Sequence, residues 1–359
     1  MPCFLYHYGT FIAVEDFMMF RAQAIFFSVL LFSLQAGAYP GFRQMTLSGQ
    51  GENVLKVAVW YPASFAGVAE SMGENAAFVG ETVLRNAPPA PGQHPLLVLS
   101  HGYNGNWRNL AWLAVALAER GYIVAAPDHP GTTTFDQNPT EARKLWQRPL
   151  DITKVIDFVT GASGQLGETD QERIAAAGHS LGGWTVMELA GARFDAVRFL
   201  HNCQQHPLRG DCRLKEKLGI DVQRSQEKLA ASYRDARIKA VISLDAGLAP
   251  GFTPQSLREI AIPVLILAAQ SDELAALPAS QESAYLADRM ASGSGTFALI
   301  KGATHFSFMQ LCKPGAGALL NAETPGDGIV CQDAEGASRS VIHYKLSRQI
   351  TAFLNAALD

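Results

Sequence analysis

The hexapeptide Gly178-His-Ser-Leu-Gly-Gly183 is the part of this chain best suited to chemistry. It follows a β-type run at 173–178 and precedes a helix-like stretch at 184–192. In a G-x-S-x-G sequence between a strand and a helix, the serine lies on a sharp turn, and the two glycines let the backbone bend without Cβ clashes. We therefore predict that Ser180 is a covalent nucleophile.

A serine nucleophile needs a base, because its hydroxyl is hardly ionised at neutral pH. The chain order that accompanies this elbow is nucleophile, acid, histidine, so the base must follow Ser180. His305 comes directly after the last predicted strand, where a loop can bring its imidazole over the serine. His201 and His206 belong to an insertion and His343 to the terminal helix, so we predict that His305 is the general base.

Two aspartates are candidates for the acid, and each follows a predicted strand. Asp245 follows the strand at 240–244, and Asp272 follows the strand at 263–268. Either carboxylate could hold the imidazole of His305 in the right tautomer and stabilise the imidazolium. An aspartate after the penultimate strand is the commoner arrangement, so we predict Asp272 and keep Asp245 as the alternative.

Backbone N–H groups can form an oxyanion hole. The elbow supplies the N–H of Leu181, the residue after the nucleophile. The loop Ser100-His-Gly-Tyr103 follows an early strand and supplies the N–H of Tyr103 as the second donor. His101 precedes the serine in the chain, so we expect it to shape this loop instead of acting as the base.

Aromatic residues near these loops could line a substrate pocket. The candidates are Trp107, Trp184 and Phe306, although Trp184 begins the elbow helix and fits core packing equally well. Asp128-His-Pro-Gly131 also follows a strand, and we interpret it as a polar turn. No Cys/His group has zinc-site spacing, so neither a metal nor a cofactor is expected.

The elements that must position these residues alternate in type. Apolar strands separated by helical patterns predict an α/β fold with a mostly parallel sheet and helices on both faces. The predicted strands, besides an antiparallel one at 55–61, are 96–100, 122–126, 174–177, 240–244, 263–268 and 296–300. Residues 64–95 are interpreted as a loop, and 39–359 as a single domain. The polar, helix-prone segment 193–237 is predicted to be a helical cap, with a plain surface excursion as the alternative.

The N-terminal residues 1–38 have the pattern of a signal peptide. Arg21 precedes an apolar run at 24–34, and Ala36-Gly-Ala38 matches a cleavage site. The run is too short to span a bilayer, so no stable membrane span is expected after its removal. Met18 and Met19 stand before the signal, so the first 17 residues could be an over-extended start. We predict a secreted or periplasmic protein.

Four cysteines remain after the predicted signal is removed, as expected for disulfides in an exported chain. They are Cys203, Cys212, Cys312 and Cys331. Three pairings are possible, and the nearest-neighbour pairing closes two short loops in irregular stretches. We favour it on loop geometry.

Bulk composition narrows the class of protein. With 359 residues and 48% hydrophobic residues, the chain can bury a large core. A net charge of −4 leaves no basic stripe, so a nucleic-acid partner does not fit. The oligomeric state is not indicated.

Several motifs together resemble a known family, the bacterial "predicted dienelactone hydrolase" group of α/β-hydrolases. These are related to the platelet-activating-factor acetylhydrolases and more distantly to cutinase-like polyester hydrolases. The motifs are Val57-Ala-Val-Trp-Tyr-Pro62, Leu99-Ser-His-Gly-Tyr103, Pro127-Asp-His-Pro-Gly131, Arg148-Pro-Leu-Asp151, the elbow, and Gly302-Ala-Thr-His-Phe-Ser-Phe308.

The resemblance implies a serine carboxylester hydrolase without metal, acting on a small, lipid or polyester-type ester. It carries the same roles onto Ser180, Asp272, His305, Tyr103 and Leu181. The acetylhydrolase branch takes its acid after the earlier strand, the position of the alternative aspartate. True dienelactone hydrolases use a cysteine nucleophile, which this elbow lacks. An amide or thioester hydrolase and a non-catalytic protein that binds a hydrophobic ligand remain as alternatives.

Overall fold

The structure is a computed structural model that describes residues 39–48, 54–64, 67–271 and 276–359. The predicted signal peptide lies outside the described residues, and so does Asp272. Everything below concerns the described part of the chain.

A ten-stranded sheet organises the described residues, in the order β10-β9-β8-β7-β5-β6-β2-β1-β4-β3. Its strands are β1 Gly41–Ser48, β2 Val54–Tyr61, β3 Ala69–Met72, β4 Glu81–Arg85, β5 Gln93–Ser100, β6 Ile123–Asp128, β7 Glu168–His179, β8 Ile238–Leu244, β9 Val264–Ser271 and β10 Gly295–Thr304. The strands from β5 to β10 pair in parallel, and β2 pairs antiparallel with β6 and β1. The mostly parallel sheet is therefore confirmed.

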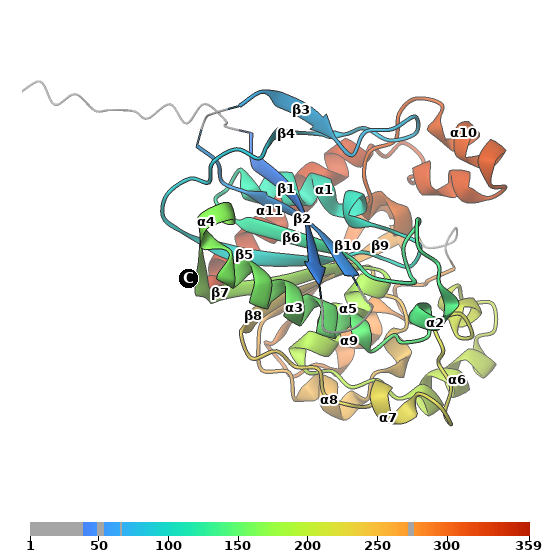
Figure 1. The fold of residues 1–359 in the computed structure, drawn as a ribbon. Coiled ribbons are helices and arrows are strands. Elements are labelled where there is room, and N and C mark those ends of the chain that lie inside the picture. Colours follow the sequence, from blue (N-terminus) through green and yellow to red (C-terminus); the bar gives the residue numbers. More distant parts are fainter. Residues whose placement is uncertain (1–38, 49–53, 65–66, 272–275) are drawn as a thin grey trace, which may run out of the picture. The chain divides into compact units, whose positions relative to one another are not determined.

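Helices cover both faces of this sheet (Figure 1). The α-helices are α1 Ala111–Ala118, α2 Pro139–Ala142, α3 Gln147–Gly161, α4 Ser163–Leu166, α5 Leu181–Ala190, α6 Ala196–Gln205, α7 Gln226–Leu229, α8 Pro254–Arg258, α9 Ser283–Arg289, α10 Ala316–Glu323 and α11 Arg339–Leu358. The 3₁₀ helices are η1 Trp107–Leu110, η2 Asp211–Leu214, η3 Ala249–Gly251, η4 His305–Phe308 and η5 Asp327–Cys331. Helices α3, α5 and α9 pack into one apolar core, and α1 and α11 into the core on the other face.

The central strands and helices follow from their apolar patterns. Ile152, Val155, Ile156 and Val159 lie at helical spacing on α3, and all four are fully buried against the sheet. Strand β7 is apolar without interruption near its end because helices cover both of its faces.

The segment 64–95 was predicted to be a loop, and this is wrong in part. It contains β3 and β4, which pair antiparallel with each other, and β4 also pairs in parallel with β1. Val83 is fully buried, and the N–H of Leu84 donates to the carbonyl of Pro40 at 2.8 Å. These strands are short and polar, so their partner β1, and not their own pattern, stabilises them.

The insertion 193–237 holds α6, η2 and α7, joined by turns. In the second half of this helix-prone segment, the α-helix is limited to the single turn of α7, while α6 lies in the first half and is capped by the side chain of Asp195. Cys203 is bonded to Cys212 and Cys312 to Cys331, with Cα–Cα distances of 5.5 and 5.7 Å. The nearest-neighbour pairing is confirmed. In the described residues, no helix is long and apolar enough to cross a membrane.

Candidate active site

The elbow has the backbone that the motif predicts. Ser180 stands between β7 and α5 with φ 56° and ψ −116°, a conformation that costs strain for a residue with a Cβ. A Cβ at Gly178 would overlap the backbone of Gly182, and a Cβ at Gly182 would overlap the carbonyl of Ser100. The glycines are therefore required because the strand, the helix and the neighbouring loop meet without space for side chains.

Ser180, His305 and Asp245 form an unbroken hydrogen-bonded chain. The Oγ of Ser180 lies 3.0 Å from Nε2 of His305. The Nδ1 of His305 lies 2.6 Å from Oδ2 of Asp245. His305 and Asp245 are both buried. A carboxylate on Nδ1 requires that nitrogen to carry the proton, which leaves Nε2 free to accept the hydroxyl proton of the serine.

The preference for Asp272 as the acid is corrected by this geometry. The carboxylate at Nδ1 of His305 belongs to Asp245, the alternative candidate, while Asp272 lies outside the described residues. Strand β8, which ends just before Asp245, pairs directly with β7, the strand that ends at the elbow. The physical reason is thus adjacency in the sheet, which sequence distance to the histidine does not measure.

The backbone around Asp245 fixes its carboxylate. Its φ is 47°, and its N–H donates to the carbonyl of Leu267 at 2.7 Å. The second carboxylate oxygen, Oδ1, accepts the N–H of Ala269 at 2.8 Å. Two residues further on, the N–H of Gly247 donates to the carbonyl of Ser180 at 3.2 Å. Backbone hydrogen bonds therefore connect the loop of the acid, residues 245–248, directly to the nucleophile; we call this loop the backbone frame behind Ser180.

The loop at 100–103 lies against the elbow. A Cβ added at Gly102 would be 3.1 Å from the Cβ of Ser180. The carbonyl of Gly102 accepts hydrogen bonds from Nδ1 of His101 at 2.7 Å and from the N–H of Gly105 at 3.2 Å. Because a trans peptide points its C=O and N–H in opposite directions, the N–H of Tyr103 points away from those donors. In the described residues, the N–H groups of Tyr103 and Leu181 have no hydrogen-bond partner.

His101 acts on this loop as a neutral donor. Burial lowers its pKa well below the usual value, and the nearby Arg148 and His129 lower it further. Its Nε2 accepts the backbone N–H of His129 at 3.0 Å, so Nδ1 carries the proton that reaches Gly102. The expectation that His101 shapes the loop agrees with these contacts.

A second group of serine, histidine and aspartate lies beneath the loop. Oγ of Ser100 lies 3.0 Å from Nε2 of His129, and Nδ1 of His129 lies 3.0 Å from Oδ2 of Asp151. The guanidinium of Arg148 donates to Ser100, to the carbonyl of His101, and to the hydroxyls of Thr132 and Thr185.

Residues 128–131 do form a polar turn, in which the N–H of Thr132 donates to the carbonyl of His129 at 3.3 Å, but the turn also contributes a side chain to this network. His129 is fully buried in this network, and burial lowers its pKa well below the usual value. Burial also raises the pKa of Asp151 to about 7 and lowers that of Arg148 to about 9. In the described residues, no group of three or more potential metal ligands occurs.

Two contacts that the sequence analysis missed hold the loop of His305. Nε2 of His179, the residue before the nucleophile, donates to the carbonyl of His305 at 2.8 Å. Nε2 of His343 on α11 donates to the carbonyl of Ser307 at 3.0 Å. His179 occupies the variable position of G-x-S-x-G, so its motif gave no signal for this role.

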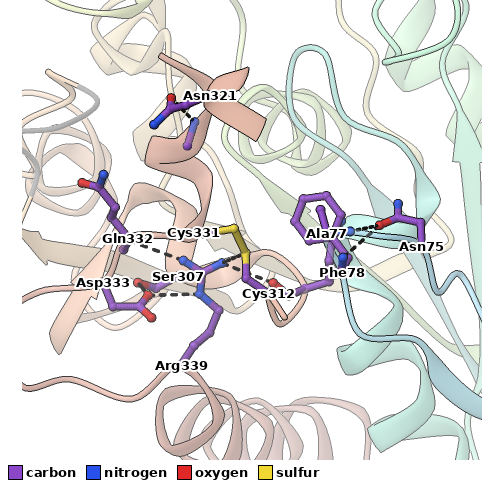
Figure 2. Close-up of a disulfide and its surroundings, with 12 residues drawn as sticks. Asn75, Ala77, Phe78, Ser307, Cys312, Asn321, Cys331, Gln332, Asp333 and Arg339 are labelled. Atoms are coloured by element: carbon purple, nitrogen blue, oxygen red, sulfur yellow. Dashed lines mark hydrogen bonds and ion pairs between the residues drawn. A yellow bond between two sulfur atoms is a disulfide. The ribbon is translucent and has the colours of Figure 1, made fainter. Parts of the chain in front are cut away.

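The second disulfide stands beside the same loop, as Figure 2 shows. Arg339 donates to Asp333 at 3.0 Å, to the carbonyl of Gln310 at 3.2 Å and to that of Gln332 at 3.4 Å. The hydroxyl of Ser307 donates to the same carboxylate of Asp333. The residues that flank the disulfide-closed segment are thereby tied to the 3₁₀ turn that begins with His305.

The predicted aromatic residues differ in their surroundings. Trp184 is fully buried among Phe194 and Phe252, with ring centroids 5.8 and 6.2 Å away, so its assignment to a substrate pocket is corrected to core packing. Phe306 is half-buried, and its ring lies edge-on to His305 with centroids 5.3 Å apart. Trp107 is buried, but it lines a cavity of about 270 Å³. The roles of Phe306 and Trp107 in binding stay predictions.

The insertion reaches the loop that carries the acid. Oδ2 of Asp211 accepts the N–H of Leu248 at 2.9 Å, and Oδ1 pairs with the buried Arg209 at 2.6 Å. The insertion therefore contacts the frame behind Ser180. Its function as a cap stays a prediction.

Comparisons with known proteins agree with this architecture. A family model described as "Alpha/beta hydrolase family" matches residues 97–312. A bis(hydroxyethyl) terephthalate hydrolase of Streptomyces coelicolor is 30% identical over 132 residues, which cover 37% of this chain and 40% of that protein. Cutinase est1 of Thermobifida alba is 35% identical over 101 residues, or 28% of this chain and 31% of that cutinase.

Among solved structures, a ferulic acid esterase from Streptomyces cinnamoneus aligns with a TM-score of 0.60 and 20% identity, covering 89% of both chains. This likeness shows the fold. The chain spans less than half the length of the curated relatives described above.

Proposed function

Because the chain belongs to the alpha/beta hydrolase family, we propose that it is a serine carboxylester hydrolase that works through an acyl-enzyme. The observation that carries the proposal is the chain from Ser180 through His305 to Asp245, with distances of 3.0 and 2.6 Å. Its donors and acceptors are those that a general base needs to activate a hydroxyl.

In the first step, Nε2 of His305 takes the hydroxyl proton while Oγ of Ser180 attacks the ester carbonyl carbon. Asp245 stabilises the imidazolium that forms. The carbonyl oxygen becomes an oxyanion and accepts hydrogen bonds from the N–H groups of Tyr103 and Leu181. Removing one such donor typically costs about 10²- to 10³-fold in kcat, so the orientation of the loop at 100–103 bears directly on the rate.

The intermediate then collapses, and its ester bond to the alcohol breaks. His305 gives its proton to the leaving alcohol, and the acyl group stays on Ser180. A water molecule next gives a proton to His305 and attacks the acyl carbon, and the second collapse releases the acid and restores the serine.

We further propose that the substrate is a polyester-type or small ester. The two curated relatives are named for bis(hydroxyethyl) terephthalate and cutin, which supports this class. The position of Asp245 after the earlier strand supports the finer resemblance to the platelet-activating-factor acetylhydrolase branch, for which a lipid ester is the alternative substrate. The two disulfides support export to an oxidising compartment, secreted or periplasmic.

A fluorophosphonate probe with peptide mapping tests the reaction class. We expect a single adduct on Ser180 and hydrolysis of p-nitrophenyl butyrate. Matched thioester and anilide substrates separate an esterase from the amide or thioester alternatives. An unlabelled Ser180 in folded, disulfide-bonded protein would falsify the proposal and favour a non-catalytic binding protein.

A further inference from the structure

Arg108 is a half-buried cation whose ring contacts and nearby charges are described below. It lies in η1, five residues after the predicted oxyanion donor Tyr103. In the described residues, its guanidinium makes no hydrogen bond and no ion pair, while its backbone N–H is satisfied by Asn106. The side chain is half-buried. Five fixed N–H donors of one guanidinium are therefore available at a partly desolvated position.

The surrounding residues hold this guanidinium in one place. It lies over the ring of Trp107, 4.4 Å from its centroid, and 5.7 Å from the ring centroid of Phe135. Its stem passes Gly73, where an added Cβ would be 3.4 Å from Cγ of Arg108. Desolvation lowers the pKa of Arg108, and the attraction of Asp128 compensates only in part. The charge is thus positioned before any ligand arrives.

Two cavities meet at this side chain. One has a volume of about 430 Å³ and the other about 270 Å³, and Arg108 and Phe135 line both. The larger cavity also reaches Asn104 and Met309, which follow Tyr103 and the turn of His305 in the chain. The larger cavity is therefore lined in part by the two loops that carry the predicted oxyanion donor and the predicted base.

Most carboxylates around these cavities are already engaged. Oε1 of Glu74 pairs with Lys313 at 2.6 Å, and Oδ1 of Asp128 accepts the N–H of Trp107 at 2.8 Å. Both oxygens of Asp136 accept backbone N–H groups at 3.0 Å. Asp327 also lines the larger cavity and is exposed to solvent. In the described residues, none of these acids forms an ion pair with Arg108.

We propose that Arg108 binds a carboxylate on the substrate, so that the enzyme prefers acidic esters such as half-esters of dicarboxylic acids. The planar guanidinium can donate two parallel hydrogen bonds to the carboxylate, which an ammonium group cannot match. An adjacent aromatic ring, Phe135, is exposed to solvent and can pack against the spacer of the substrate. The catalytic part of this inference rests on the proposed esterase activity.

Two matched substrate pairs test the preference. Mono-p-nitrophenyl adipate and its methyl ester differ by a carboxylate on the acyl side, and 4-acetoxybenzoate and its methyl ester differ by one on the alcohol side. We expect R108Q to lower kcat/KM for the acidic member of at least one pair by about 10- to 100-fold and to change the neutral members less than about 2-fold. R108K should recover only part of the loss.

Arg348 provides a matched control, because it also stacks on an aromatic ring, that of Tyr344 at 5.7 Å, but does not line either cavity. R348Q should leave all four substrates unchanged. Equal losses for acidic and neutral esters in R108Q, or no loss in either pair, would overturn the proposal.

Binding to catalytically inactive protein separates this inference from the proposed reaction. Calorimetry with S180A should detect binding of adipate or 4-hydroxybenzoate. We expect S180A/R108Q to lose this affinity and S180A/R348Q to retain it. Equal affinity in all three proteins, or tighter binding of a neutral polyol such as xylose, would contradict a carboxylate site. Failure of fluorophosphonate labelling with Arg108-dependent adipate binding would instead remove only the esterase.

Discussion

Two groups of serine, histidine and aspartate meet the loop at 100–103, and their internal distances are similar. In the group of Ser180 the serine–histidine and histidine–aspartate distances are 3.0 and 2.6 Å. In the group of Ser100 both distances are 3.0 Å. The first serine lies on a strained turn and is partly exposed, whereas the second is fully buried at the end of β5.

The difference lies in what surrounds each serine. Ser180 is followed by Leu181 and lies against the loop of Tyr103, and in the described residues the N–H groups of these two residues have no partner, as the proposed oxyanion hole requires. Ser100 instead accepts a hydrogen bond from the buried Arg148 at 3.2 Å, and the same guanidinium donates to the backbone carbonyl of His101 in the loop. Similar hydrogen-bond distances thus fit the proposed catalysis in one place and loop positioning in the other, because reaction also requires access and an oxyanion site.

The largest expected contrast is between the two serines. Ser180→Ala should lower kcat for p-nitrophenyl butyrate by about 10⁴- to 10⁶-fold, because the nucleophile is lost. In Ser100→Ala, kcat should stay within about 10-fold of the wild-type value, and Ser180 should still be labelled by the fluorophosphonate. A loss of labelling in folded Ser100→Ala would contradict the division of roles.

The acids give the next contrast. Asp245→Asn should reduce kcat by about 10³- to 10⁴-fold, because an amide at Nδ1 favours the wrong tautomer of His305. Asp272→Asn should change kcat less than about 3-fold, since Asp245 already fills the position on the histidine. Steady-state kinetics of both proteins decide this, and the reverse result would restore Asp272 as the acid.

The buried network should matter more for stability than for chemistry. Arg148→Met removes a buried cation, its attraction to the buried Asp151, and the donor to Thr132, Thr185 and the carbonyl of His101, so unfolding in urea should cost about 3–5 kcal/mol less. Arg237→Met is the control, because Arg237 forms more exposed ion pairs with Asp157 and Asp235 and should cost about 1 kcal/mol or less. A similar loss of unfolding free energy in both variants would contradict the prediction that the buried network contributes more to stability than exposed ion pairs.

The last contrast is a pH dependence of stability, which leaves activity near neutral pH unchanged and comes from a histidine beneath the His305 loop. His343 is stacked on Trp112 with centroids 3.8 Å apart, and burial lowers its pKa to about 3. As the pH falls below about 6.5, His343 becomes protonated in the unfolded chain but stays neutral in the folded chain. Stability should therefore fall between about pH 6.5 and 3.

Urea unfolding across this range measures that slope. His343→Gln should reduce it by up to about 1.4 kcal/mol per pH unit. The lowered pKa values of His101, His129 and His179 act in the same direction, so part of the slope remains in this variant. An unchanged slope would show that His343 is protonated in the folded protein.

Much of the fold follows from local pattern. Each strand from β5 to β10 contains an apolar run, and the spacing on α3 gives its buried face directly, so the sequence pattern predicts both. Strands β3 and β4 were not predicted, because their stability comes from the pairing of β4 with β1, which is distant in sequence. Trp184 was ambiguous for a related reason: the same ring suits a pocket or a core, and only its contacts with Phe194 and Phe252 decide.

By itself, the sequence determined the positions of the elbow serine and of the histidine opposite it, because a nucleophile elbow and a base after the last strand are local features. Short loops favoured the nearest-neighbour disulfides among three possible pairings, and the structure contains that pairing. Tertiary structure alone decided that Asp245 reaches His305, that Ser100 is buried beside Arg148, and that Arg108, without an ion pair in the described residues, lines two cavities. Each of these features depends on which strands are neighbours in the sheet and on which residues cover a side chain. Neither can be inferred from a short stretch of sequence.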